Sequence, residues 1–154
     1  MKANNILNIV SEVTITYKSK VKASERVKVS SAADSIKVFL SIEHFNKNIE
    51  LYECFYAMYL NRNNKVLSVL MISEGGTSGT VIDIKKIATP AILQNASAVI
   101  LSHNHPSGNN QPNSQDKQIT DKITAGLQLI DVQLIDHIII TDESFFSFAN
   151  EGLI

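Results

Sequence analysis

Two histidines separated by a single residue, His103 and His105, are followed by Asp116 eleven residues after the second one. Imidazole nitrogens and carboxylate oxygens are ligands with which proteins hold Zn²⁺. Three such protein ligands with a water in the fourth position are typical of catalytic zinc sites, whereas structural sites are closed by four protein ligands. The spacing therefore predicts a metal site of the hydrolytic kind.

The segment that carries the histidines is predicted to be the end of a strand. Residues 98–101 form a short apolar run that is partly β-branched, which is typical of a buried strand. Because strand side chains alternate between two faces, His103 and His105 project to the same side. Pro106 cannot donate a backbone hydrogen bond and ends the strand, and the polar residues 107–112 are predicted to turn the chain.

A helix is predicted to carry the third ligand. Asn113 or Ser114 suits the N-cap, which puts Asp116 in the first turn. The apolar residues that follow recur at helical spacing, and they are Ile119, Ile123, Leu127 and Ile130. Two other interpretations stay open at this point. Asp116 can be an ordinary capping-box acid, and the histidines can be an exposed pair at a strand end.

A family resemblance adds to this interpretation. The run His103-Asn104-His105-Pro106-Ser107-Gly108, with Asp116 after it, resembles the JAB/JAMM (MPN) metalloprotease signature, and more narrowly that of the bacterial RadC family. The resemblance extends from about residue 30 to residue 154 and includes residues 52–60, 136–140 and 148–154. It implies an α+β fold, a mixed β-sheet flanked by helices with cytidine-deaminase-like layering.

The resemblance also implies a function. It implies one Zn²⁺ per chain, held by His103, His105 and Asp116, an upstream glutamate as general acid/base, and hydrolysis of a peptide or isopeptide bond. The family usually has a serine eight residues after the second histidine, and in the metalloprotease relatives this serine helps to stabilise the tetrahedral intermediate. Here Asn113 occupies that position and the serine is Ser114. Asn113 and Ser114 are therefore both candidates for the oxyanion donor.

The choice of the glutamate rests on a predicted hairpin. Residues 54–60 and 65–72 are two strand-like runs joined by a polar turn. Glu53 lies at the entrance of the first strand, where the family has its glutamate, and is the expected base. Glu74 is the runner-up, although Gly75 and Gly76 beside it favour a turn. A solvated glutamate at a strand end is the alternative for Glu53.

Three other residues carry weaker signals. His137 lies in the apolar run 134–140 and is expected to be a hydrogen-bonded sheet histidine or a group that supports a ligand. His44 is expected at the surface. Cys54 is the only cysteine, which excludes an intrachain disulfide and a thiolate-rich metal site. Alternation predicts that Cys54 faces away from Glu53.

The rest of the chain is predicted to form one domain over residues 1–154, with its core from about residue 30. A helix from Ser30 or Ser31 to about Ile42, a short strand at residues 81–82 and a helix capped by Asp83 through about Ala96 are expected. Pro90 is expected to kink this last helix or to delay its start. Residues 13–17 and 27–29 alternate like strands at a sheet edge.

Charge and composition limit the partners. The net charge is −1, yet residues 1–30 are basic, with Lys2, Lys18, Lys20, Lys22, Arg26 and Lys28. An edge blunted by lysine is favoured over nucleic-acid contact, so weak DNA binding at most is expected. No apolar run is long enough for a membrane span or a secretory signal, and the single cysteine suits a reducing compartment, so a cytoplasmic location is expected.

Two functions remain at this stage. The first is a zinc-dependent metallohydrolase that acts on a protein or peptide substrate. The second is a non-catalytic metal-binding accessory factor in DNA repair or mobile-element biology. The sequence indicates neither the substrate nor the oligomeric state.

Overall fold

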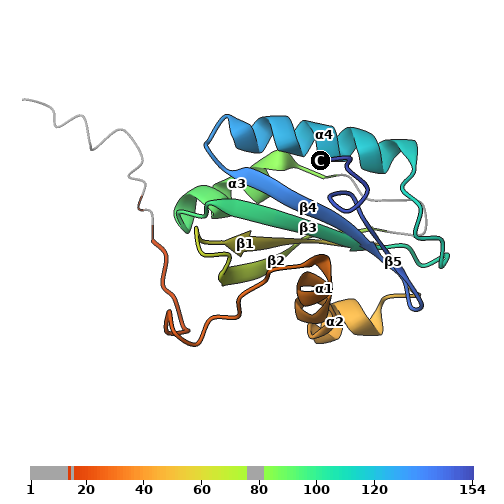
Figure 1. The fold of residues 1–154 in the computed structure, drawn as a ribbon, viewed down its shortest axis with the longest axis horizontal. Coiled ribbons are helices and arrows are strands. Elements are labelled where there is room, and N and C mark those ends of the chain that lie inside the picture. Colours follow the sequence, from red (N-terminus) through yellow and green to blue (C-terminus); the bar gives the residue numbers. More distant parts are fainter. Residues whose placement is uncertain (1–13, 15, 76–81) are drawn as a thin grey trace, which may run out of the picture.

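A computed structural model describes residue 14 and residues 16–75 and 82–154, and it shows a β-sheet between two layers of helices (Figure 1). The elements follow the order α1 (Ala32–Leu40), α2 (Glu43–Lys47), β1 (Cys54–Leu60), β2 (Val66–Glu74), α3 (Ile84–Leu93), β3 (Ala98–Asn104), α4 (Ser114–Gln128), β4 (Gln133–Ile140) and β5 (Phe145–Ser147). Helices α3 and α4 cover one face of the sheet, and α1 and α2 cover the other (Figure 1). The predicted α+β fold, with a mixed sheet flanked by helices, is confirmed.

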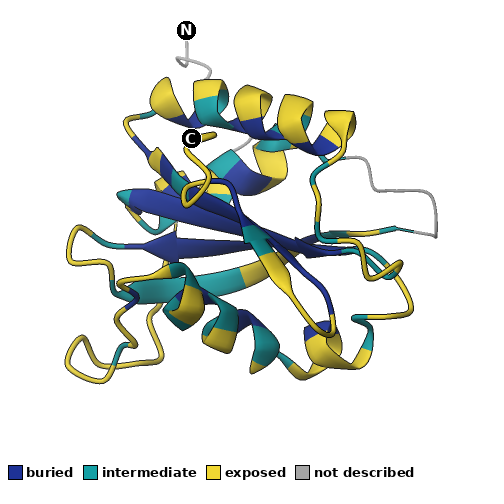
Figure 2. Ribbon diagram, turned by 45° about the vertical axis from the view of Figure 1, so that its right-hand side comes forward, coloured by how far each residue is buried: buried dark blue, intermediate teal, exposed yellow. Residues whose placement is uncertain are grey.

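The sheet has the strand order β2-β1-β3-β4-β5. Strand β1 pairs antiparallel with both β2 and β3, whereas β3 and β4 are parallel and are connected through α4. A parallel pair needs such a crossover connection. Every residue of β1 and of β3 is buried, as Figure 2 shows for the centre of the sheet. Their nearly continuous apolar runs follow from this burial on both faces.

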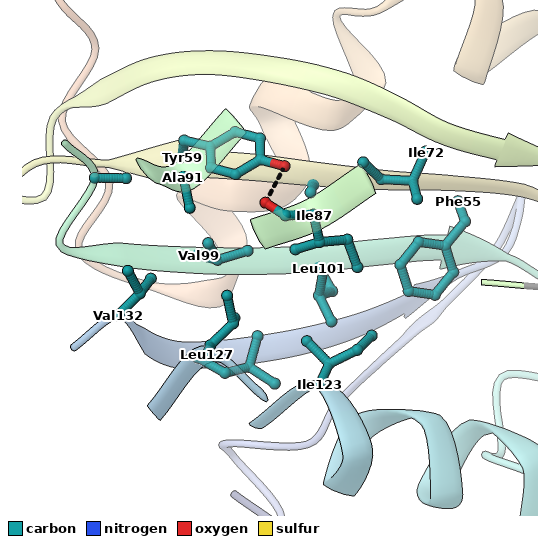
Figure 3. Packing of buried hydrophobic residues seen from close by; sticks show 13 residues of the cluster. Phe55, Tyr59, Ile72, Ile87, Ala91, Val99, Leu101, Ile123, Leu127 and Val132 are labelled. Carbon is teal, nitrogen blue, oxygen red and sulfur yellow. Dashed lines mark hydrogen bonds between the residues drawn. The ribbon is translucent and has the colours of Figure 1, made fainter. Parts of the chain in front are cut away.

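The two faces of the sheet carry separate hydrophobic clusters. On the side of α3 and α4, Phe55, Leu101 and Ile123 belong to one cluster, and the Tyr59 hydroxyl donates to the Ile87 carbonyl at 3.1 Å within it (Figure 3). On the side of α1 and α2, the buried residues Phe39, Phe45, Cys54 and Tyr56 belong to the other. Neighbouring residues of β1 thus face opposite layers, and Cys54 faces away from Glu53 as expected.

The predicted helix starts are correct, and two of the helices end earlier than predicted. Ser31, Asp83 and Asn113 are the N-caps of α1, α3 and α4. The first helix ends at Leu40, and the short helix α2, which contains His44, was not predicted. Helix α3 ends at Leu93, and Pro90 lies inside it without delaying its start. Asn95 at positive φ follows that end.

Two strand segments predicted near the start of the chain are not strands in the described residues. Thr14, Thr16 and Tyr17 lie in no strand, and Val13 and Ile15 are outside the described residues. Residues 27–29 form only an isolated bridge, between Lys28 and Lys65. The chain crosses the turn of the β1–β2 hairpin there, through backbone bonds from Val29 to Asn64 and from Val66 to Val27. Alternation alone does not supply a partner edge along which a strand can pair.

The short strand expected at residues 81–82 is also wrong where it can be tested. Ile82 lies outside any strand, and Val81 is not among the described residues. Over the described ranges, no helix is long and apolar enough to cross a membrane.

Candidate metal centre

The three predicted ligands converge at the end of β3 and the start of α4. The Nε2 atoms of His103 and His105 lie 3.0 Å apart. The two carboxylate oxygens of Asp116 lie 3.2 Å from the Nε2 atom of His103 and 3.5 Å from that of His105. A tetrahedral Zn²⁺ with bonds of about 2.0–2.1 Å holds its ligand atoms about 3.3–3.4 Å apart. The spacing of the three donor groups therefore fits a single metal ion of this size.

Asp116 serves as helix cap and as candidate ligand at the same time. Its Oδ2 atom accepts from the Asn113 backbone N–H at 2.8 Å, and the Asn113 side chain accepts from the Asp116 N–H at 2.8 Å. This reciprocal pair is a capping box. The Oδ1 atom meanwhile faces His103. The capping-box interpretation is thus correct, and the cap fixes the carboxylate where it can also serve as a ligand.

A chain of hydrogen bonds determines which nitrogen of His103 is free. Thr120 donates its hydroxyl hydrogen to the Asp116 carbonyl at 2.6 Å. The Thr120 oxygen can therefore only accept from His137 Nδ1, 2.6 Å away. His137 Nε2 is then an acceptor, and His103 Nδ1 donates to it at 2.8 Å. His103 Nε2 keeps its lone pair for a metal, which is the tautomer that a ligand needs.

His105 is oriented by a backbone carbonyl. Its Nδ1 atom lies 2.7 Å from the Asn109 carbonyl oxygen, to which it donates, so its Nε2 is also free to ligate. The turn that brings Asn109 back uses Gly108 at φ 77°, a conformation that side chains with a Cβ rarely adopt. The Gly108 N–H donates to the His105 carbonyl at 3.0 Å and closes this turn.

His137 is a hydrogen-bonded histidine within the sheet, which was one of the two roles expected for it. It is fully buried, and burial, followed by the charge of His103, lowers its pKa well below the usual value. A neutral imidazole is what the hydrogen-bond chain requires. Thr120 was not predicted from the sequence. The available signal was its position four residues after Asp116, on the same face of α4.

The charge of the site suits a cation. Burial of the Asp116 carboxyl raises its pKa, but the adjacent imidazoles of His103 and His105 and the Asn113 N–H outweigh this and hold that pKa well below its usual range. The hydrogen bond to Asp116 is the largest effect on His105, and together with the Asn109 carbonyl and the charges of Asp116 and Glu53 it raises the pKa of His105 against burial. The Asp116 carboxylate therefore stays ionised, and the raised pKa of His105 indicates negative potential at that imidazole.

Strand register and alternation direct Glu53 and Glu74 to opposite sides of the sheet. Phe55 pairs with His103, so Glu53, two residues before Phe55, is directed to the histidine side. It is half-buried, and its charge contributes to the raised pKa of His105. Glu74 instead pairs with Cys54, and its Oε1 atom lies 3.4 Å from His44 Nε2.

Asn113 and Ser114 are both exposed at the start of α4. The Asn113 side-chain oxygen is used by the cap, which leaves its Nδ2 group as the donor that this side chain can offer. Ser114 is the first residue of the helix. His44 is exposed, as expected for a surface residue.

Asn104, the residue between the two histidines, was not singled out from the sequence. It is fully buried, and its Nδ2 group donates to the carbonyls of Ile49 and Tyr52 at 2.8 and 2.7 Å. Its Oδ1 atom accepts from the Cys54 N–H at 2.7 Å. The histidine strand thus holds the segment that contains Glu53. The signal in the sequence was a polar residue at a position that alternation directs into the core.

Comparisons with known proteins give the family. The model of the RadC-like JAB domain matches residues 29–153. A UPF0758 protein of Flavobacterium johnsoniae is 41% identical over 102 residues, which is 66% of this chain and 44% of that protein. A UPF0758 protein of Porphyromonas gingivalis is 36% identical over 136 residues, 88% of this chain and 60% of that protein.

The UPF0758 protein YfjY of Escherichia coli is 38% identical over 102 residues, which is 66% of this chain and 64% of that protein. The matches therefore cover between 44% and 64% of the length of these three relatives. The match to the domain model covers most of the chain and contains all three candidate ligands. This chain belongs to the RadC family and carries its RadC-like JAB domain.

Proposed function

We propose that this domain is a zinc-dependent metallohydrolase that cleaves a peptide or isopeptide bond. The observation that carries the proposal is the convergence of His103, His105 and Asp116, with the Nε2 atoms of both histidines beside the carboxylate. Zn²⁺ bound there would lower the pKa of a coordinated water to about 7 and would polarise a substrate carbonyl. Three protein ligands leave a coordination position for this purpose.

Glu53 is proposed as the general acid/base. Its side of the sheet and its influence on the pKa of His105 support this role. A carboxylate at that point can take a proton from the attacking water and return it to the leaving amine. Glu74, the runner-up, lies beside His44 on the other face, which argues against it. Asn104 acts as a positioning residue, because it holds the backbone on both sides of Glu53.

The oxyanion donor is proposed to be Asn113 or Ser114. Both belong to the N-terminus of α4 next to Asp116. A donor there acts only if it lies about 2.7–3.1 Å from the developing charge. Asn113 is the first choice, because its position matches the family's serine and its Nδ2 group can donate.

The experiment that tests the proposal combines metal analysis with hydrolysis of a peptide and isopeptide library. Glu53→Gln is expected to keep zinc and to lose about 10²–10⁴-fold in turnover. Glu50→Gln is the matched control, because Glu50 is an exposed acid three residues away. His103→Ala combined with His105→Ala is expected to lose one equivalent of zinc together with all hydrolysis.

The possible results separate the parts of the proposal. Loss of zinc in Glu53→Gln would make Glu53 a ligand, and unchanged turnover would remove it from the reaction. A purified protein that holds a redox metal in place of zinc would contradict the assignment, because two histidines and one carboxylate also suit iron(II). Zinc without hydrolysis of any library member would favour the accessory-factor function.

A further inference from the structure

A second group of metal-ligand side chains lies on the opposite face of the sheet. His44, Cys54 and Glu74 offer one imidazole nitrogen, one sulfur and one carboxylate oxygen, all within 4.8 Å of one another. They come from α2, β1 and β2. We call these three residues the His44–Cys54–Glu74 cluster.

The fold brings the three side chains together in a defined way. Cys54 and Glu74 are direct partners in the antiparallel β1–β2 pair, so they share a face. Phe45, the neighbour of His44, is fully buried and packs edge-on against the Tyr56 ring, with the ring centroids 5.4 Å apart. This packing holds α2 against the sheet, and His44 therefore lies above the strand ends.

The imidazole of His44 contacts the Tyr56 hydroxyl through one nitrogen and faces Glu74 with the other. Its Nδ1 atom is 3.1 Å from the Tyr56 hydroxyl, and its Nε2 atom is 3.4 Å from Glu74 Oε1. A hydrogen bond on one nitrogen that directs the other towards the ion is the usual arrangement of a histidine ligand. The distance of 3.4 Å also suits two ligands of one tetrahedral ion.

The charges near Cys54 are negative, which disfavours a nucleophilic thiol and suits a cation. Burial is the largest effect, and the charges of Glu74 and Glu53 add to it, raising the pKa of the Cys54 thiol to about 11. Reactive cysteines have lowered pKa values and electropositive surroundings. A bound divalent cation would lower the pKa of the Cys54 thiol, because it stabilises the thiolate directly.

We propose that His44, Cys54 and Glu74 form a second metal site, which takes a borderline-soft divalent cation such as Zn²⁺. The ion would be bound by the imidazole Nε2, the thiolate and a carboxylate oxygen, a set that suits zinc. The metal–sulfur bond forms as the thiol proton leaves to solvent, and no electrons are transferred. His44 and Glu74 are exposed while Cys54 is buried, so the ion enters from the α2 side.

The proposed site would connect α2 to the β1–β2 pair at the point where β1 begins. Cys54 directly follows Glu53, and its backbone N–H is held by Asn104. An ion at the cluster would therefore stabilise the strand entrance from the face opposite His103. The site is independent of any hydrolytic activity.

Cobalt(II) titration tests the proposal with a signal that only this site can give. Cys54 is the only cysteine, and the His103–His105–Asp116 group contains no sulfur. A near-ultraviolet sulfur-to-cobalt charge-transfer band therefore reports the cluster alone, even in the wild-type protein with its other site loaded. We expect the band to saturate at one equivalent of Co²⁺ and to disappear when Zn²⁺ is added.

The variants make the test specific. His44→Gln is expected to lose the band, whereas Glu43→Gln, an exposed neighbour on the same helix, keeps it. Tyr56→Phe retains the ring and removes the hydroxyl, and it should weaken Co²⁺ binding by about 10–100-fold. Far-ultraviolet circular dichroism verifies folding. Cys54→Ser is expected to lose the band too. If Cys54→Ser unfolds the protein because Cys54 is buried, the result for His44→Gln, at an exposed position, is the one that tests the site.

Two results would overturn the proposal. One is the lack of a charge-transfer band in folded wild-type protein at saturating Co²⁺. The other is a band that persists unchanged in His44→Gln, because it would show that Cys54 binds the metal without the cluster.

Discussion

The Asn104 side-chain carbonyl accepts a hydrogen bond at 2.7 Å from the backbone N–H of Cys54, the residue after Glu53. The same side chain donates at 2.7 Å to the carbonyl of Tyr52, the residue before Glu53. One amide thus holds the chain on both sides of the proposed base. It belongs to the strand that positions both histidines, so the two parts of the site are coupled through Asn104.

Asn104→Leu is expected to destabilise the fold and to displace Glu53. The substitution leaves buried backbone groups unpaired, at about 1–3 kcal/mol for each, which urea unfolding measures. If the domain is a hydrolase, turnover should fall while zinc stays bound, because the change replaces none of the three proposed ligands. A variant with wild-type stability and turnover would contradict the positioning role.

Thr120→Val is expected to weaken zinc binding without removing a ligand. The change keeps the shape of the side chain but leaves His137 Nδ1 without its acceptor, so His103 loses its fixed tautomer. Loss of such a supporting group costs about 10–100-fold in metal affinity, which chelator competition measures. Thr124→Val is the matched control, since its hydroxyl bonds only the Thr120 carbonyl; equal losses in both variants would refute the argument.

Zinc affinity at the His103–His105–Asp116 group is expected to rise with pH. The folded, metal-free protein has a raised pKa at His105, mainly through the hydrogen bond to Asp116. At pH values below that raised value, His105 keeps a proton that zinc must displace. Affinity should increase by about tenfold per pH unit in this window and level off above it. Calorimetry in buffers of different ionisation enthalpy counts the released proton, and a flat profile would contradict the shift.

The same shift has a defined sign for the stability of the metal-free protein. Because the pKa of His105 is raised on folding, its stabilising contribution is complete below pH 6.5 and is lost as pH rises through the folded value. The pKa of Asp116 is lowered, so its contribution is present above 3.8 and is lost as pH falls through its folded value. Chemical denaturation as a function of pH measures both limits.

Asn113→Ser is expected to leave zinc binding unchanged and to raise turnover on any substrate found. Serine is as good an N-cap as asparagine, so the capping box with Asp116 persists. The hydroxyl is a shorter donor than the amide, and a well-placed oxyanion donor contributes about 10²–10³ in rate. Ser114→Ala is the companion variant. A drop in turnover for Asn113→Ser would identify the asparagine amide as the adapted donor.

DNA binding is expected to be weak at physiological salt. Lys18, Lys20 and Lys22 are exposed, but the chain carries a net charge of −1. Affinity from these lysines should fall steeply with salt and with their replacement by glutamine. Fluorescence anisotropy with duplex DNA measures it. Tight, sequence-selective binding would favour the accessory-factor function over hydrolysis.

Local signals in the sequence were enough to bring out the candidate metal ligands and much of the frame around them. The strand period directs His103 and His105 to one side, and the Asn113 cap sets Asp116 in the first turn of α4. Caps and short strand runs depend on neighbouring residues, so the predicted N-caps Ser31 and Asp83 are also confirmed. The same local rules failed at residues 14, 16 and 17 and at residues 27–29, since a strand requires a partner edge that alternation does not reveal.

Only the tertiary structure decided which groups meet from distant parts of the chain. Sheet register pairs Phe55 with His103, which directs Glu53 towards the histidine side, and pairs Glu74 with Cys54 on the other. These pairings depend on the arrangement of three strands. The link from His103 through His137 to Thr120 joins β3, β4 and α4. No spacing along the sequence specifies such contacts, because they arise from the packing of elements against a common sheet.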